Sequence, residues 1–186
     1  MTDKLSIYNG AAMALGDRKI LSLTENRETR RALDGVWDRD GVKTCLQMGM
    51  WNFATRSLKY DYSPSVEPPF GFKRAFNKPE DWIRTVGVCE DEFYKVPLLQ
   101  YQDEAAYWFA DLDTIYVRFV SGLTDFGMNF AAWPQNFTRF VELWFALQIC
   151  KRTTNSQTDK DSLKKDAEQA LTLAKSTDAM DEATVF

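Results

Sequence analysis

The sequence contains no histidine and only three cysteines among its 186 residues. Histidine is the commonest general base near neutral pH and the commonest metal ligand, so its absence argues against His-dependent hydrolases and His-ligated metal centres. Cys45, Cys89 and Cys150 are odd in number and widely spaced, which fits neither a disulfide framework nor a zinc site. We therefore expect three reduced thiols, no metal and no cofactor.

Several motifs of common enzymes are missing as well. The chain has no Gly-rich phosphate loop, no Gly-x-Ser-x-Gly nucleophile elbow and no Cys-x-x-Cys pair. Residues 1–4 lack the basic and apolar regions of a signal peptide, and no apolar run approaches the length that spans a bilayer. These absences predict a non-enzymatic protein that is made in a cytoplasm and has no membrane partner.

Aromatic residues are abundant, at 14% of the chain, with 13 Phe, 7 Tyr and 6 Trp. Aromatic side chains bury large areas in cores and are enriched at protein interfaces, so the composition fits either use. The formal net charge is −4 and the pI is about 5.0. Proteins that grip nucleic acid through its phosphates usually carry a basic face, so the net charge argues against that function.

The hydrophobic period divides the chain into helical ends and a β-rich middle. Residues 1–55 predict two helices, the first ending at Gly16 and the second capped by Thr24, with a possible break at residues 38–41. Residues 127–175 predict two more, one starting at Pro134 and one capped by Thr158. Residues 176–186 are predicted to form a tail.

The middle segment, residues 56–126, has the alternation typical of strands. Apolar residues alternate with polar ones across residues 57–62, and residues 82–86 form a second apolar, β-branched run. Residues 106–110 and 114–120 flank Asp111-Leu112-Asp113, which predicts a hairpin with a tight turn. The expected fold is one α+β domain over residues 1–186, mainly helical: a small four-helix bundle with a β-rich insertion between helices 2 and 3 and an extended C-terminal tail.

An ordered set of short motifs resembles a known family. In chain order these are Ala14-Leu15-Gly16, Leu23-Thr24-Glu25, Met50-Trp51-Asn52-Phe53-Ala54, Arg74-Ala75-Phe76 with Pro79 and Trp82, Tyr116-Val117-Arg118-Phe119-Val120, Trp133-Pro134-Gln135-Asn136-Phe137, and an alanine-rich helix through Ala167, Ala170 and Ala174 to Asp178-Ala179. Together they resemble the tail tubular protein A-like head-to-tail adaptors of tailed bacteriophages, and the resemblance covers nearly the whole chain.

The resemblance implies a structural virion protein at the head-tail junction. Such a protein would form a homo-oligomeric ring, commonly a dodecamer, that binds the portal protein on one side and a downstream tail, stopper or nozzle protein on the other. It would line the channel through which double-stranded DNA passes without specific binding. A net negative charge suits such a channel, because a cationic wall would hold phosphates.

Three groups of residues are predicted to carry this function. Met180, Val185 and Phe186 would dock the C-terminal segment on the portal. Arg27, Arg30 and Arg31, at the start of the second predicted helix, would pair with the adjacent subunit. Tyr60, Tyr62, Tyr107 and Trp108 would form a tail-facing surface of the insertion, although the same rings also suit the insertion's own core.

Other interpretations remain open at this point. Asp103, Glu104, Asp111 and Asp113 could serve as the paired carboxylates of a tail-associated carbohydrate-active hydrolase, although turn formation also explains Asp111 and Asp113. Asp38-Arg39-Asp40-Gly41 imitates the start of a calcium loop but lacks the later oxygen ligands. A helical interaction protein outside any virion is a further alternative.

Overall fold

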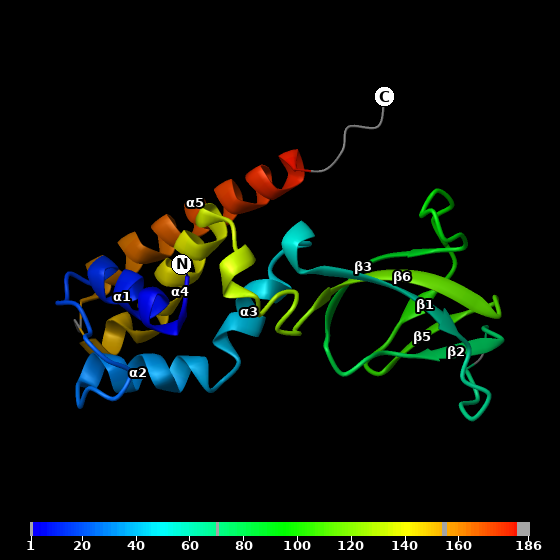
Figure 1. Cartoon of the computed structure of the whole chain (residues 1–186), viewed down its shortest axis with the longest axis horizontal. Helices are drawn as coiled ribbons and strands as arrows, with labels where there is room; N and C mark the ends of the chain where they lie inside the picture. The colour runs from blue at the N-terminus through cyan, green and yellow to red at the C-terminus, as the bar shows by residue number, and fades with distance from the viewer. Residues whose placement is uncertain (1, 70, 154–155, 182–186) are drawn as a thin grey trace. The chain divides into compact units, whose positions relative to one another are not determined.

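A computed structural model describes residues 2–69, 71–153 and 156–181 of the chain. The chain divides into two compact units. The first, the helical unit, combines residues 1–53 with residues 128–186, and the second, the β unit, is the continuous segment 54–127. Figure 1 colours the chain from the N-terminus to the C-terminus and labels the α-helices and most of the strands described below.

The helical unit contains elements from both ends of the chain. They are α1 (Lys4–Ala14), α2 (Glu28–Trp37), α3 (Gly41–Gln47), the 3-10 turns η1 (Asn52–Ala54, whose last residue opens the β unit) and η2 (Phe130–Ala132), α4 (Gln135–Thr153) and α5 (Gln157–Met180). No helix among the described residues is long and apolar enough to cross a bilayer.

The expectation of a four-helix bundle is wrong. The described residues form five α-helices and two three-stranded antiparallel sheets, with about 44% helix and 19% strand, which is a mixed α+β fold. The second predicted helix is two helices, because Asp40 adopts a left-handed conformation (φ 56°) that interrupts the helical path between α2 and α3. The extended tail predicted from Ser176 is also wrong as far as Met180, because α5 continues to that residue.

One predicted helix boundary is confirmed and two are wrong. Gly16 adopts the positive φ of +70° expected just after a helix C-cap, as predicted. The second helix begins at Glu28 and not at Thr24, because residues 17–27 are held in a loop by side-chain hydrogen bonds. The last helix is capped by Ser156, whose hydroxyl accepts from the Asp159 amide, and not by Thr158.

The core of the helical unit is built around α4. Its Phe137, Phe140, Val141 and Phe145 are all buried. Aromatic rings form a continuous series of contacts through the unit, with neighbouring centroids 4.7–6.1 Å apart: Tyr8, Trp37, Phe130, Trp133, Phe137, Trp51 and Phe53. Because these rings come from both ends of the chain, the unit closes only when both ends are present.

The β unit consists of two antiparallel sheets. One has the order β1 (Thr55–Asp61), β6 (Thr114–Ser121) and β3 (Trp82–Cys89), and the other has the order β2 (Arg74–Asn77), β5 (Tyr107–Ala110) and β4 (Gln102–Asp103). In the first sheet Leu58 lies opposite Val117, and in the second Phe76 lies opposite Trp108.

The hairpin predicted around Asp111-Leu112-Asp113 does not form, although both of its strands do. β5 pairs with β2 and β4, whereas β6 pairs with β1 and β3, so the turn carries the chain from one sheet to the other. Both strands bury most of their residues. Each strand pairs within its own sheet, and the two sheets pack face to face over the core that they share. Strand content was readable from the sequence, but strand pairing was not.

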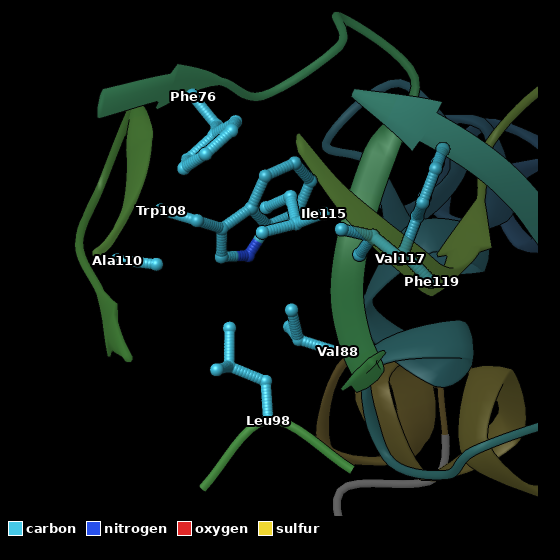
Figure 2. Close-up of a cluster of buried hydrophobic side chains, with 8 residues drawn as sticks. All are labelled: Phe76, Val88, Leu98, Trp108, Ala110, Ile115, Val117 and Phe119. Atoms are coloured by element: carbon cyan, nitrogen blue, oxygen red, sulfur yellow. The ribbon is translucent and has the colours of Figure 1, made fainter. Parts of the chain in front are cut away.

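A single cluster of side chains fills the space between the two sheets. Its members are Phe76, Val88, Leu98, Trp108, Ala110, Ile115, Val117 and Phe119, all buried (Figure 2). Figure 2 shows the Trp108 indole projecting from β5 toward Ile115 on β6. The cluster draws on four strands and one loop of the same continuous segment, so the β unit has a core of its own.

Candidate interaction surfaces

The predicted arginine cluster mainly holds its own unit together. Arg27 pairs with Asp17 and donates from Nη1 to the Lys19 carbonyl at 3.1 Å. Arg30 pairs with Asp34. Both arginine side chains are mostly buried.

Arg31 is the accessible member of the cluster. Its side chain is half exposed and pairs with Glu28 at 3.0 Å. Glu28 also pairs with Arg152 of α4 at 2.5 Å. Pairing of the cluster with an adjacent subunit stays a prediction, and Arg31 is the residue best placed for it.

Asp34 is the acidic centre of this region. Tyr8 donates its hydroxyl to Asp34 at 2.8 Å, and Lys4 lies 3.3 Å from the same carboxylate. Burial opposes ionisation of Asp34, but the hydrogen bonds from Tyr8, Lys4 and Arg30, together with the positive charge of Lys4, outweigh it and lower the pKa of the carboxyl. Burial and the same carboxylate raise the pKa of Tyr8. Asp34 therefore stays ionised and fixes the start of α1 against α2.

The loop between α1 and α2 presents an exposed basic and apolar surface. We call residues 18–23 the basic loop. Its backbone is anchored at Ile20, which donates to Asn9 Oδ1 at 2.7 Å and accepts from Asn9 Nδ2 at 3.1 Å. Ile20 itself is fully buried, whereas Leu21 next to it is 80% exposed. Arg18 and Lys19 are also exposed, and neither forms an ion pair with another described residue.

The connection between β3 and β4 presents a second exposed surface, of opposite charge. We call residues 90–99 the acidic loop. The Asp91 carboxylate accepts from the backbone amides of Phe93, Lys95 and Val96, the last at 2.7 Å. The bond from Val96 is the main cause that lowers the pKa of Asp91, and slight burial does not reverse it. The Glu90 amide donates to the Val96 carbonyl at 2.9 Å and closes the turn.

Apolar side chains project outward from this ordered loop. Leu98 is buried in the core of the β unit, but Leu99 beside it is 87% exposed. Phe93 is 69% exposed and Val96 about half exposed. Glu90 and Glu92 are exposed and form no ion pair with another described residue. Three exposed apolar residues within seven positions, preceded by two exposed glutamates, make this loop a candidate protein-binding surface.

The four aromatic residues predicted to face the tail have unequal access to solvent. Trp108 is 0% exposed and lies at the centre of the β unit's core. Tyr60 packs on it with ring centroids 5.5 Å apart, and burial raises the pKa of Tyr60 to about 12. Tyr62 stacks under the Arg74 guanidinium at 4.0 Å, and Tyr107 contacts Phe109. Their contact with a tail protein stays a prediction.

The predicted portal-docking residues fall at the end of α5. Met180 is its last residue and is 77% exposed. Val185 and Phe186 lie outside the described residues. The position of Met180 leaves its side chain available to a partner, and docking on the portal stays a prediction for all three.

The four carboxylates of the alternative hydrolase interpretation all have structural partners. Asp111 accepts from the Lys73 amide at 2.9 Å, and Asp113 accepts from Arg74 Nε at 2.6 Å. Glu104 accepts from Gln102 Nε2 at 2.8 Å. These bonds fix the turn and the edge of the second sheet, which is the structural role expected of turn aspartates.

Asp103 belongs to a polar network inside the β unit. It pairs with Lys78, whose side chain is only 3% exposed, and accepts from Thr85 Oγ1 at 2.5 Å and Trp108 Nε1 at 3.2 Å. The Lys78 ammonium lies 3.6 Å from the centre of the Trp82 ring. The network joins β3 of one sheet to β4 and β5 of the other, so its carboxylate is used to fasten the two sheets together.

Asp178 is a key residue of the helical unit that the sequence did not reveal. It is 8% exposed, and both of its carboxylate oxygens accept from the Asn52 amide, at 3.0 and 3.1 Å. The Asn52 side chain returns the contact by donating to the Asp178 carbonyl at 2.8 Å. The bond fastens the last turns of α5 to the point where the chain leaves for the β unit.

The calcium-loop resemblance of residues 38–41 has a structural explanation. Asp40 precedes α3 and pairs with Lys43 at 3.0 Å. Within the part of the chain that the structure describes, no group of three or more His, Cys, Asp or Glu side chains is arranged to hold a metal ion. Cys45, Cys89 and Cys150 are buried, and burial raises the pKa of Cys45 and Cys89.

No family model and no curated protein matches this chain. The resemblance to the adaptor family therefore rests on the ordered motifs alone. The two exposed loops were absent from the sequence-based candidates. The run of three acidic residues before Phe93, Glu90-Asp91-Glu92, was visible in the sequence, but only the structure distinguishes the exposed Phe93 and Leu99 from the buried Leu98.

Proposed function

We propose that this chain is a subunit of a head-to-tail adaptor ring of a tailed bacteriophage, a structural virion protein that joins the portal to the tail. The observation that carries the proposal is the division of the chain into a helical unit made from both of its ends and a β unit inserted as one continuous segment, 54–127. A bridging protein needs two surfaces that can engage two partners, and two units with separate cores supply them.

The positions of the family-like motifs also support the proposal. Ala14-Leu15-Gly16 forms the C-terminal end of α1, where Gly16 supplies the required positive φ. Trp51, Asn52 and Phe53 lie where the chain leaves the helical unit, with Trp51 buried against Phe137 at 4.7 Å. The motifs thus lie at points that define the fold, which is the pattern expected when a structural protein is constrained by its architecture.

The net charge of −4 supports the passage of DNA through the ring without adhesion. In this proposal the ring binds the portal through the C-terminal region, which includes Met180, Val185 and Phe186. The β unit binds the downstream tail, stopper or nozzle protein. The chain has no catalytic role.

The test is to mix the purified protein with the portal ring encoded by the same genome and to image the product by electron microscopy. A second ring stacked coaxially on the portal is the expected result. A variant with Val185→Ser and Phe186→Ser should bind the portal at least about tenfold more weakly. Met13→Ser is the matched control, because Met13 is an exposed methionine of α1 and should bind normally. Two well-folded partners that form no complex would refute the proposal and favour a helical interaction protein outside the virion.

A further inference from the structure

The acidic loop and the basic loop are complementary in both charge and polarity. The acidic loop combines Glu90 and Glu92 with exposed Phe93, Val96 and Leu99, and the basic loop combines Arg18 and Lys19 with exposed Leu21. None of these four charges has an ion-pair partner among the described residues. The acidic loop also carries the exposed Lys95, but its net charge is negative, so the two loops offer each other opposite net charge beside apolar surface.

Both loops are held in shape before any partner binds. Asp91 and the bond between Glu90 and Val96 fix the acidic loop, and Asn9 holds the basic loop through Ile20. A surface with a fixed backbone loses little conformational entropy on binding, so even a small contact between such loops gains affinity.

We propose that the acidic loop of one copy of this chain docks on the basic loop of a second copy. Phe93 and Leu99 pack on Leu21 of the other copy, and Glu90 and Glu92 pair with its Arg18 and Lys19. The inference deepens the proposed function, because it names a subunit contact of the ring.

The symmetry of this contact has a direct consequence. In the proposed ring the contact is heterologous: the acidic loop of one copy binds the basic loop of the next, and an open pair leaves one free loop of each kind. Contacts of this type repeat from copy to copy and close into a ring when the rotation allows it. A two-fold dimer in which each acidic loop docks on the basic loop of the other copy would use all four loops at once, so assemblies larger than two copies in sedimentation are expected for the ring.

Cross-linking between two differently labelled copies tests the contact. One copy carries Leu21→Cys and the other Leu99→Cys, and the two are mixed under mild oxidation, both free and with the portal ring. A disulfide-linked heterodimer is the expected product in at least one of the two preparations. Leu173→Cys mixed with Leu99→Cys is the matched control, because Leu173 is exposed on α5, outside either loop. The three native cysteines are buried and give little background.

Charge reversal gives an independent measurement. Glu90→Lys with Glu92→Lys should weaken self-association roughly tenfold, measured by sedimentation, and so should Arg18→Glu with Lys19→Glu in the other loop. In a mixture of the two variants every contact between unlike copies carries opposite charges, in both directions, so association should recover. Variants that misfold would be recognised by circular dichroism, and the cross-link between cysteine variants does not depend on them.

The outcomes separate this inference from the proposed function. A coaxial ring on the portal without the cross-link would overturn the loop contact and leave the adaptor proposal intact. A cross-link without portal binding would support the loop contact and overturn the adaptor proposal. If Phe93→Ser with Leu99→Ser abolishes binding of the portal or of a tail protein but leaves self-association unchanged, the acidic loop serves that other protein and the inference is wrong.

Discussion

The helical unit and the β unit form their cores in different ways. The β unit closes its core within one continuous segment, 54–127, around Trp108. The helical unit brings together residues 1–53 and 128–186, and its aromatic series crosses between them. A core formed by neighbouring segments pays less loop-closure entropy than one formed by the ends of a chain. The inserted β unit therefore depends less on distant parts of the chain to form its core than the helical unit does.

The two units also use polar bonds between distant residues for different ends. In the β unit, Lys78 and Asp103 fasten one sheet to the other. In the helical unit, Asp178 fastens α5 to Asn52, at the exit toward the insertion. Apolar burial is non-directional, whereas a buried hydrogen bond requires one geometry. We infer that these bonds fix the positions of the bonded elements relative to one another within each unit.

The largest expected effect comes from replacing the ring at the centre of the β unit. Trp108→Ala should destabilise this unit by about 3–5 kcal/mol, because it leaves a cavity and removes the indole donor to Thr85 and Asp103. Denaturant titration followed by far-ultraviolet circular dichroism should show the β transition shifting alone.

Phe137→Ala is the matched change in the helical unit, where this ring contacts Trp51 and Trp133. It should cost a similar amount and shift the helical transition. If either substitution moved both transitions together, the two units would unfold as one cooperative body, and the comparison above would fail.

The next largest effect should come from the buried lysine. Lys78→Met leaves Asp103 without its cation and should cost about 2 kcal/mol in the free energy of unfolding. Lys73→Met in the same unit is the control, because Lys73 is exposed and should change stability by less than about 0.5 kcal/mol. If urea denaturation gave the same change in the free energy of unfolding for both substitutions, the Lys78–Asp103 network would not stabilise the β unit.

A smaller effect is expected at the end of α5. Asp178→Ala removes the acceptor of the Asn52 amide and should destabilise the helical unit by about 1–2 kcal/mol. Hydrogen exchange should also become faster at the Asn52 amide. Asp166→Ala, an exposed change on the same helix, should leave both quantities unchanged. Retained protection of Asn52 in Asp178→Ala would contradict the assignment of this bond.

The smallest effect depends on pH. Burial of Glu142 against α1 raises the pKa of its carboxyl, and Arg139 at 3.4 Å offsets this only in part. A folded pKa above the unfolded value, near about 4.3, means that the stabilisation is complete below the unfolded pKa and is lost as pH rises through the folded pKa. Glu142→Gln removes this loss, so the variant should be more stable than the native chain at pH 7 by about 0.5 kcal/mol.

Thermal unfolding of both proteins across pH 4 to 8 checks this. The advantage of Glu142→Gln should disappear as the pH falls below the folded pKa. A constant difference at every pH would mean that the charge of Glu142 does not matter, and that the substitution acts through packing against Gly10, where the two residues lie in close contact.

Sequence reasoning located the elements better than their partners. Period and turn residues indicated the end of α1 near Gly16, a strand over residues 57–62 where β1 spans Thr55–Asp61, and the helix after Pro134. They missed the sheet change after β5, because pairing depends on which faces are buried by distant strands. They also missed the contact of Asp178 with Asn52, since no local pattern connects residues that far apart in the chain.

The candidate sites show the same division. The sequence identified Trp108 as a ring on a strand, but its complete burial follows from strands that come before and after it. Arg27 and Arg30 read as a charged helix face, yet the fold brings Asp17 and Asp34 to them. The exposed loops at residues 18–23 and 90–99 were overlooked because the sequence does not show which of two neighbouring apolar residues is buried and which is exposed.

The sequence by itself determined the absence of histidine, the acidic net charge and the order of helical ends around a β-rich middle, because composition and local period are written residue by residue. Only the tertiary structure decided that the middle forms two sheets around one core, and that the described residues of the helical ends form five α-helices in place of a four-helix bundle. It alone decided which charges are paired inside the chain and which face outward. Burial and pairing are properties of residues that meet in space, and the free energy that selects them comes from contacts between distant parts of the chain.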